Sequence, residues 1–348
     1  MILPTGKLPP ELLDDLLRRY SLPDDRLLVG PRAGEDAAVI DFRAGAVTPD
    51  GSFLVAKTAP ITFATDEIGW YAVNVNANDV ATMGAQPRWF LATVLLPAGR
   101  TTPALAERIF AQMHAACREL GIAMAGGHTE ITHGLDRPMI CGTLLGEVAP
   151  ADLVVTAGAR VGDAVYFLRA APIEGTALIA REKETDLLRR GVDAALVGRA
   201  QHFLHAPGIS VVPVARLVCA SLRPHCMHDP TEGGVVTGLW EIARAAGVGL
   251  RVDLQRVPVP AEGRVLCDLY GLDPLGTIAS GGLLVTVGPE DGPRLVSVCQ
   301  QAAVPVTCLG DVVDASEGVM ERGSRSEWVP LRTFAADEIT RLFADDAA

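Results

Sequence analysis

The sequence has little positive charge and no framework of cysteines. Lys and Arg number 30 against 42 Asp and Glu, which gives a net charge of −12. A protein that binds nucleic acid or an anionic membrane needs basic patches, so neither partner is expected. The seven cysteines form no C-x-x-C pair. An odd number without framework spacing is typical of reduced, mostly buried thiols in a cytoplasmic protein.

Long apolar runs and the common catalytic fingerprints are also missing. We find no apolar run of membrane-spanning length, and residues 1–7 have no signal-peptide core. A membrane span is therefore not expected. The sequence contains no G-x-S-x-G elbow, no P-loop and no Rossmann glycine fingerprint. A phosphorylated ligand stays compatible with the acidic chain if metal ions bridge the repulsion.

What is present suits two α+β domains. At 348 residues the chain is long enough for two domains of roughly 100–200 residues each. Apolar residues make up 49% of it, and 35 glycines and 24 prolines predict many turns and backbone-lined sites. We expect a first domain over residues 1–154 and a second over residues 155–348 with a short tail, joined by a hinge near residues 154–162.

The alternation of apolar runs with turn signals predicts the elements of both domains. In the first domain we expect helices over 9–20, 65–83 and 102–120 and strands over 37–42, 52–58, 89–96, 121–131 and 138–149. In the second we expect helices over 174–190, 193–205, 209–222, 231–246 and 335–343 and strands over 164–169, 248–254, 281–287 and 305–313. Asp66 and Glu67 should lie in the first turn of one helix, and Thr231 should cap another.

The most informative stretch runs from Val29 to Asp41. A glycine-bearing turn there delivers two acids, Glu35 and Asp36, to the start of the apolar run Ala37–Ile40. A carboxylate at a strand entrance is well placed to bind Mg²⁺ on a nucleotide, because Mg²⁺ prefers hard oxygen ligands plus phosphate. An Asx-type turn that opens a surface strand explains the same residues, so the stretch alone leaves both interpretations open.

Two amides and an acid interrupt the otherwise apolar helix predicted over residues 65–83. Asn74 and Asn78 are four residues apart and share a face, and Asp79 follows directly. Such groups are costly inside a helix unless they are hydrogen-bonded. They form either a structural network that caps neighbouring strands or, at Asp79, a second metal-binding carboxylate.

A glycine pair lies in the segment Ala125–Ile131, which we expect at a junction between strand and loop. Backbone N–H groups of Gly126 and Gly127, together with the Thr129 hydroxyl, can cradle a phosphate in such a loop. Because Gly-Gly turns are common, this signal is weak by itself.

The segment His228–Gly234 leads into a predicted helix. Asp229 lies beside the helix N-terminus, which favours phosphate, and is therefore a third candidate carboxylate; simple helix initiation is the alternative. Zinc-type ligands also occur here, but their spacing matches no ordinary closed site, so we expect a loop with buried thiols. Those ligands are Cys219, His225, Cys226 and His228.

Taken in order, these segments resemble the superfamily of aminoimidazole ribonucleotide synthetase from about residue 28 to residue 319. The motifs that carry the resemblance are Gly34-Glu-Asp-Ala-Ala-Val39, Asn78-Asp-Val-Ala-Thr-Met-Gly-Ala-Gln-Pro87, Gly126-Gly-His-Thr129, Gly162-Asp163 and His228-Asp-Pro-Thr-Glu-Gly-Gly234. Asp273-Pro-Leu and Ala279-Ser-Gly-Gly-Leu-Leu284 are most similar to the HypE-like branch of hydrogenase expression/formation proteins.

The resemblance implies a two-domain PurM-like fold, α+β in class. Its N-terminal domain would pair with a second copy to form a barrel-like sheet core with ATP at the interface. The chemistry implied is ATP-driven activation of an oxygen, usually of an amide or related carbonyl, through a phosphorylated intermediate. By the same resemblance Mg²⁺ is bound by Asp36, Asp79 and Asp229. The nucleotide is bound by these acids together with Asn78, Gly126, Gly127 and Thr129, while no catalytic residue is identified.

The sequence departs from the family pattern in two places. The family usually has a metal-binding Asp after the second strand, and Ala59 stands there in the segment Lys57–Pro60. A methyl group cannot bind Mg²⁺, so a metal is lost, another acid such as Asp66 or Glu35 compensates, or activity is reduced. HypE proteins end in a cysteine, whereas this sequence ends at Ala348 and its last cysteine is Cys308.

We therefore expect a cytoplasmic, ATP-dependent, HypE-like enzyme. It should act as a homodimer on a small-molecule or protein-bound substrate, with a maturation partner protein as a further expectation. The alternative is a non-catalytic paralogue that binds nucleotide or a partner during hydrogenase metallocofactor maturation. Ala59 and the missing terminal cysteine favour the paralogue, while the three intact aspartates favour the enzyme.

Overall fold

The computed structural model describes Glu11 and residues 27–29, 35–41 and 52–343. These residues form two compact units. The N-terminal unit contains residues 27–29, 37–41 and 52–153, and the C-terminal unit contains Glu11, residues 35–36 and residues 154–343. The helix predicted over residues 9–20 lies, apart from Glu11, outside the described residues.

The N-terminal unit is built on a six-stranded sheet. Its order is β1 (Leu27–Val29), β2 (Ala38–Asp41), β3 (Phe53–Ile61), β6 (Met139–Val148), β4 (Gln86–Pro97) and β5 (Ala123–Thr132). All neighbours are antiparallel except β4 and β5, which are parallel. A parallel pair needs a crossover connection, and the helix α3 (Pro103–Leu120) provides it.

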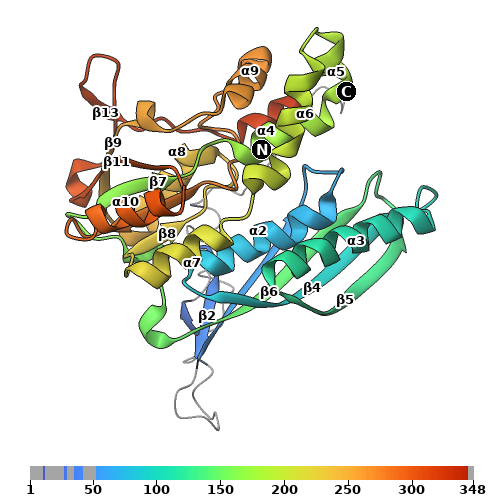
Figure 1. Cartoon of the computed structure of the whole chain (residues 1–348), viewed down its shortest axis with the longest axis horizontal. Helices are drawn as coiled ribbons and strands as arrows, with labels where there is room; N and C mark the ends of the chain where they lie inside the picture. Colours follow the sequence, from blue (N-terminus) through green and yellow to red (C-terminus); the bar gives the residue numbers. More distant parts are fainter. Residues whose placement is uncertain (1–10, 12–26, 30–34, 42–51, 344–348) are drawn as a thin grey trace. The chain divides into compact units, whose positions relative to one another are not determined.

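Two helices cover one face of this sheet. Side chains of β4 and β6 alternate between buried and partly exposed positions, as expected for strands with one covered face. Figure 1 shows α2 (Ile68–Thr82) and α3 side by side over that face. The predicted bounds of α3 are confirmed, because Thr102 Oγ1 accepts a hydrogen bond from Leu105 N and Gly121 ends the helix with φ 69°.

The start of α2 differs from the prediction. The helix begins at Ile68, and Glu67 precedes it with a left-handed φ of 57° and no side-chain cap bond. A residue in that conformation is outside the helix. Asp66 and Glu67 are therefore not in the first turn, and the prediction that they lie there was wrong.

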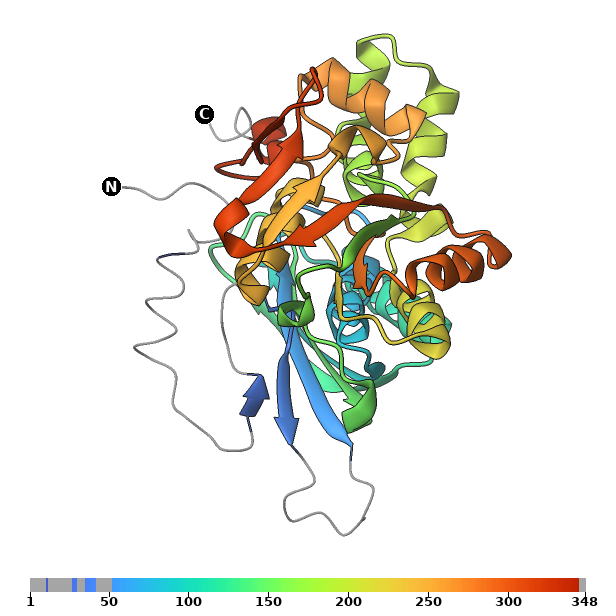
Figure 2. The same cartoon turned by 90° about the vertical axis from the view of Figure 1, so that its left-hand side faces the viewer.

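The C-terminal unit contains a seven-stranded sheet. Its order is β13 (Trp328–Pro330), β12 (Val319–Arg322), β9 (Gly249–Val252), β11 (Val306–Val313), β7 (Ala164–Leu168), β10 (Leu283–Val287) and β8 (Cys226–His228). Figure 2 shows its strands coloured from green to red. The helices of this unit are α4 (Ile173–Glu182), α5 (Glu184–Arg189), α6 (Ala194–His202), α7 (Val212–Ser221), α8 (Gly234–Ala246), α9 (Ala261–Tyr270) and α10 (Gly292–Gln301).

The core of the C-terminal unit lies between this sheet and α8. Val165 and Phe167 of β7 pack in one cluster with Val235, Leu239 and other apolar residues of α8. These four side chains are fully buried. Burying such a side chain stabilises a fold by about 1.5–3 kcal/mol, so this cluster fixes where α8 begins.

Several elements of the C-terminal unit were not predicted. The segment around Cys226 was expected as a loop but forms β8, whose three residues pair with β10. The helices α9 and α10 and the strands β12 and β13 were missed. Thr231 was expected as the N-cap of α8, yet the cap is Gly233, with φ 80° and no side-chain cap bond. The last predicted helix is a short 3-10 turn, Glu338–Leu342.

One segment, Ala194–Ser221, is long and apolar enough to cross a membrane by length and composition alone, with a mean hydropathy of 1.5 over its best window. The structure divides it into α6, a π-helical turn over Leu204–Gly208 and α7, with non-helical φ/ψ at Ala206. Lipid cannot satisfy backbone groups freed by such a break. The segment is better explained by its packing against α4, α9 and α10.

Candidate functional site

Asp36 is held by a buried histidine in the C-terminal unit. His228 Nδ1 lies 2.7 Å from Asp36 Oδ1, and its Nε2 lies 2.9 Å from Glu241 Oε2. Asp36 is 7% exposed and His228 is 3% exposed. His228 lies on the strand β8 and Glu241 on the helix α8. Both contacts of the histidine therefore start from regular secondary structure.

Electrostatics favour the charged form of this histidine. Burial alone would lower the pKa of His228, but the carboxylates of Asp36 and Glu241 outweigh it and hold that pKa well above its usual value. An imidazolium donates from both nitrogens, which matches its two carboxylate neighbours. The two acids therefore hold the histidine as a cation next to Asp36.

Asp229 lies close to Asp36 within the same unit. It is 1% exposed, and one of its carboxylate oxygens lies within 4.8 Å of one of Asp36. Magnesium takes oxygen ligands at about 2.0–2.1 Å, so one ion joins oxygens up to about 4.2 Å apart, and carboxylates at the 4.8 Å limit would share it after a small approach. The donor types fit Mg²⁺, and the structure contains no ion.

The two glycines after Asp229 shape the start of α8. Gly233 and Gly234 have φ of 80° and 64°, a region that side chains disfavour. A Cβ on Gly234 would lie 2.4 Å from the carbonyl oxygen of Leu275. The glycine pair of this motif is therefore required for packing, whatever it binds.

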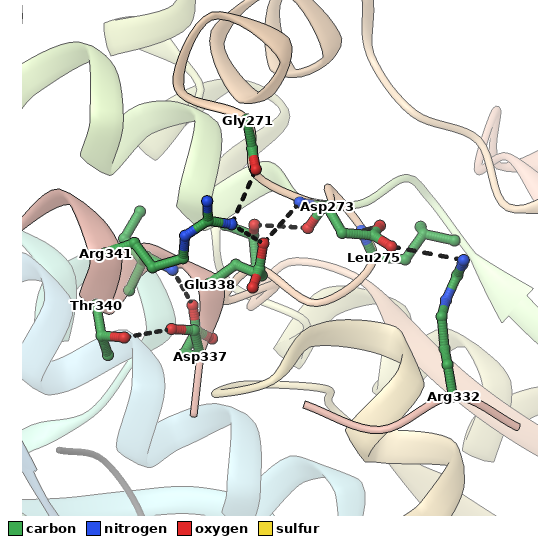
Figure 3. A network of polar contacts seen from close by, with 10 residues as sticks. Gly271, Asp273, Leu275, Arg332, Asp337, Glu338, Thr340 and Arg341 are labelled. Carbon is green, nitrogen blue, oxygen red and sulfur yellow. Dashed lines mark hydrogen bonds and ion pairs between the residues drawn. The ribbon is translucent and has the colours of Figure 1, made fainter. Parts of the chain in front are cut away.

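The first turn of α8 also contacts an acid from the end of the chain. Asp337 Oδ2 accepts a hydrogen bond of 2.6 Å from Gly233 N, and Oδ1 accepts one of 2.7 Å from Ile339 N. Figure 3 shows Asp337 beside Glu338, whose carboxylate contacts Asp273 N and Arg341. Burial raises the pKa of Asp337 to about 7.

A second buried acid stands near this network. Glu174, in the first turn of α4, is 4% exposed. Burial raises its pKa to about 7, and the charge of Asp337 adds to the effect while the Ser280 hydroxyl opposes it. Glu174 and Asp337 were not predicted from the sequence, because an isolated acid in an apolar segment has no motif.

The Gly162-Asp163 motif has a structural role in this unit. Asp163 Oδ1 lies 2.8 Å from His225 Nδ1, and Oδ2 accepts hydrogen bonds from Arg160 N and the Thr286 hydroxyl. His225 and His228 thus contact different acids. Among the residues that the structure describes, they do not converge with a cysteine into a metal cluster.

Asp79 belongs to the N-terminal unit, on α2. It is 5% exposed, and Lys57 Nζ on β3 lies 2.9 Å from its Oδ2. Asn78 beside it is fully buried. Asn74 Nδ2 donates to Trp70 O at 3.0 Å, so at least this amide has the structural role that was one of the two alternatives.

Asn76, which the sequence analysis passed over, joins α2 to β3. Its Nδ2 donates to Ala72 O at 2.8 Å and to Ala59 O at 3.3 Å. A Cβ on Gly142 of β6 would lie 2.5 Å from the same nitrogen. The polar spacing along α2 could have suggested Asn76, since it stands midway between Asn74 and Asn78.

Gly126, Gly127 and Thr129 lie within a strand. The prediction of a strand–loop junction was wrong, because β5 continues through them. A Cβ on Gly127 would lie 2.0 Å from Ala92 O, whereas a Cβ on Gly126 would meet nothing within 4 Å. Close approach of β4 therefore explains Gly127, and both glycines and Thr129 stay exposed on β5.

Comparison with protein families places these residues in a known pair of domains. The family described as AIR synthase related protein, N-terminal domain, matches residues 34–148. The family described as AIR synthase related protein, C-terminal domain, matches residues 160–322. Carbamoyl dehydratase HypE of Cupriavidus necator is 32% identical over 272 residues, which cover 76% of this chain and 72% of that protein.

Solved structures agree with this similarity. HypE in complex with ATP is 25% identical and has a TM-score of 0.67, with 95% of this chain and 96% of that chain covered. A HypE–HypF complex has a TM-score of 0.68 at 21% identity, with 92% of this chain and 99% of that chain covered, and shows likeness of fold alone.

Proposed function

The chain belongs to the AIR synthase related protein family, in its HypE-like branch, and we propose that it is an ATP-dependent enzyme that activates a carbonyl or amide oxygen by phosphorylation. The observation that carries the proposal is the buried pair of carboxylates, Asp36 and Asp229, within 4.8 Å of each other. Two carboxyl groups this close offer hard oxygen ligands to a cation, and Mg²⁺ brings a nucleotide phosphate with it.

We assign Mg²⁺ to Asp36, Asp79 and Asp229, as the family resemblance implies. Asn78, Gly126, Gly127 and Thr129 are proposed as further contacts of the nucleotide. The ATP complex of HypE supports the nucleotide. Bound Mg²⁺ would neutralise phosphate charge, while the chain's own residues orient the phosphates and exclude water. His228, which Glu241 also contacts, would fix the position of Asp36.

The substrate class follows from the branch. The relative in Cupriavidus necator is a carbamoyl dehydratase, so a carbamoyl or similar amide oxygen is the proposed phosphate acceptor. Either a small molecule or a protein-bound group could supply it. We keep residues 1–154 as the nucleotide-binding and dimerisation domain and residues 155–348 as the second domain.

A homodimer and a maturation partner complete the proposal. The apolar residues on the uncovered face of the N-terminal sheet support a second copy as the contact. One solved HypE structure contains HypF. We therefore propose a partner protein of the maturation machinery, which co-purification from the native cells would detect.

The second candidate is a nucleotide- or partner-binding paralogue without turnover. It is favoured by Ala59, which offers no metal ligand, and by the ion pair of Lys57 with Asp79. Both observations reduce the number of carboxylates that remain for metal in the N-terminal unit.

Calorimetric titration with Mg–ATP tests the site. Asp36→Asn and Asp79→Asn should each weaken binding by more than about 1 kcal/mol, as the loss of a charged ligand does. Asp163→Asn is a matched control, because Asp163 is equally buried but binds His225. Unchanged affinity in both site variants, with the fold intact, would reject the assignment.

Phosphate release then separates enzyme from paralogue. The enzyme should release phosphate from ATP when carbamoyl-type substrates are present, and release should fall with Asp36→Asn. Binding of Mg–ATP without release across the substrate panel would favour the paralogue.

A further inference from the structure

Lys57 places an ammonium group beside a candidate metal-binding acid. Its Nζ lies 2.9 Å from Asp79 Oδ2, where the side chain of Lys57 is 25% exposed and that of Asp79 is 7% exposed. A carboxylate removed from water needs a nearby positive charge. At Asp79 the chain itself supplies one, before any metal ion arrives.

Lys57 and Ala59 share one face of β3. Exposure alternates along this strand, and Phe53, Val55 and Ile61 are buried on the same side as these two residues. Successive odd positions of a strand point to one face, here the face that packs against α2. The hydrogen bond from Asn76 to Ala59 O fixes that register. An acid at position 59 would therefore stand beside the lysine and on the side of Asp79.

We propose that the Lys57 ammonium takes the place of one divalent cation at Asp79, as a built-in counter-cation that matches the loss of an acid at position 59. The inference rests on the proposed nucleotide site. Aspartates at positions 59 and 79 would carry two negative charges and need a divalent ion. With Ala59 and Lys57 the same positions hold one carboxylate and one ammonium, so they need one divalent ion fewer for neutrality than two aspartates would.

The charges also oppose metal binding at this point. A divalent ion on Asp79 would share its carboxylate with the ammonium and be repelled by it, and such repulsion is strong at short range in a partly buried setting. The proposal therefore predicts that removal of the lysine charge makes Asp79 a better metal ligand. A purely structural ion pair predicts only a loss of stability.

Manganese binding provides the test. Free Mn²⁺ is measured by electron paramagnetic resonance while it is titrated into the full chain, first alone and then with a non-hydrolysable ATP analogue. Lys57→Met should tighten Mn²⁺ binding about tenfold, and Lys57→Arg, which keeps the charge, should not. The double variant Lys57→Met with Ala59→Asp should bind one more Mn²⁺ per chain than the parent.

Two controls separate the proposal from a folding defect. Lys57→Met with Asp79→Asn removes both charges and should gain no Mn²⁺. If Lys57→Met alone is unstable, Mn²⁺ should raise its melting temperature more than that of the parent, because a ligand stabilises the state that binds it. A lack of both the tighter binding and the selective rise in melting temperature would overturn the proposal.

The titration without nucleotide decides this inference independently of the proposed enzyme. If the chain fails to bind the ATP analogue but Lys57→Met still gains Mn²⁺, the role of Lys57 as counter-cation is supported and the ATP-dependent function is rejected. If the analogue binds and the parent already holds as many Mn²⁺ ions as the double variant, only the role of Lys57 as counter-cation is rejected.

Discussion

The sheets of the two units differ in how completely the chain covers them. In the C-terminal unit β10 is buried at all five residues and β7 at four of five. In the N-terminal unit β5 is exposed from Ala123 to Ile131, and β4 and β6 bury only alternate residues. The centre of the C-terminal sheet is thus buried on both faces, although its strands β12 and β13 have no buried residue, while the N-terminal sheet has one covered face.

The same contrast applies to buried acids. Asp79 of the N-terminal unit has Lys57 at 2.9 Å. Glu174 of the C-terminal unit has no lysine or arginine partner among the described residues, and burial raises its pKa to about 7. Asp79 is thus paired with a cation, as Asp36 is with His228, whereas Glu174 is held close to its protonated form.

The largest effect should come from placing a charge on the exposed edge strand. We expect Ile131→Asp, on β5, to abolish a homodimer, because a charge in an apolar interface is costly. Val161→Asp in the C-terminal unit is a matched control, since Ile131 and Val161 are both 60% exposed. Light scattering at low micromolar concentration should report a dimer for the parent and the control but a monomer for Ile131→Asp.

Two results would break the comparison between the sheets. A parent chain that is a monomer of about 37 kDa yet binds Mg–ATP would show that the uncovered face needs no second copy. A dimer that survives Ile131→Asp but not Val161→Asp would move the interface to the C-terminal unit.

Local patterning predicted most elements of the N-terminal unit. The helix α3 follows from its threonine cap and terminal glycine, and β4 and β6 follow from their apolar runs. The start of α2 was missed because Glu67 adopts a left-handed conformation that helix propensity does not encode. In the C-terminal unit β8 was missed because three residues are too few for a period-two pattern.

The candidate site was predictable in its acids and not in their partners. Asp36, Asp79 and Asp229 follow from short motifs, and all three are buried. Their cationic neighbours, His228 and Lys57, are brought to them by tertiary packing, which no local motif encodes. Gly127 looked like a phosphate loop because a glycine pair gives the same signal in a loop and in a close strand contact.

The second prediction concerns the buried acid Glu174 and the pH dependence of stability. The raised pKa of Glu174, about 7 against its usual value of 4.5, means that the folded state holds a proton that the unfolded state releases. The contribution of Glu174 to the free energy of unfolding is therefore complete below pH 4.5 and is lost as the pH rises to about 7. For the C-terminal unit, Glu174→Gln should remove about 2 kcal/mol of the stability loss between about pH 5.5 and 8.

Hydrogen exchange of the amides of α4 and α8 against those of α2 and α3 measures this effect unit by unit. Asp337 also has a raised pKa of about 7, so the variant should keep part of the pH dependence. If Glu174→Gln leaves the profile of α4 and α8 unchanged, then Glu174 is ionised in the fold and the contrast with Asp79 disappears.

The smallest effect tests whether the exposed edge of the N-terminal sheet is held by backbone packing. Gly126 and Gly127 have similar φ values, 149° and 145°, so alanine strains the backbone similarly at both. Only at Gly127 would the new Cβ meet Ala92 O, at 2.0 Å, while Gly126 faces open space. Gly127→Ala should therefore lower the free energy of unfolding by about 1 kcal/mol or more relative to Gly126→Ala, because overpacking forces β4 and β5 apart. Urea denaturation of both variants measures the difference, and amide exchange along β5 locates it. If the two variants are equally stable, β5 can move away from β4 without loss of stability. The edge of the N-terminal sheet is then less tightly packed than the parallel pairing of β5 with β4 implies.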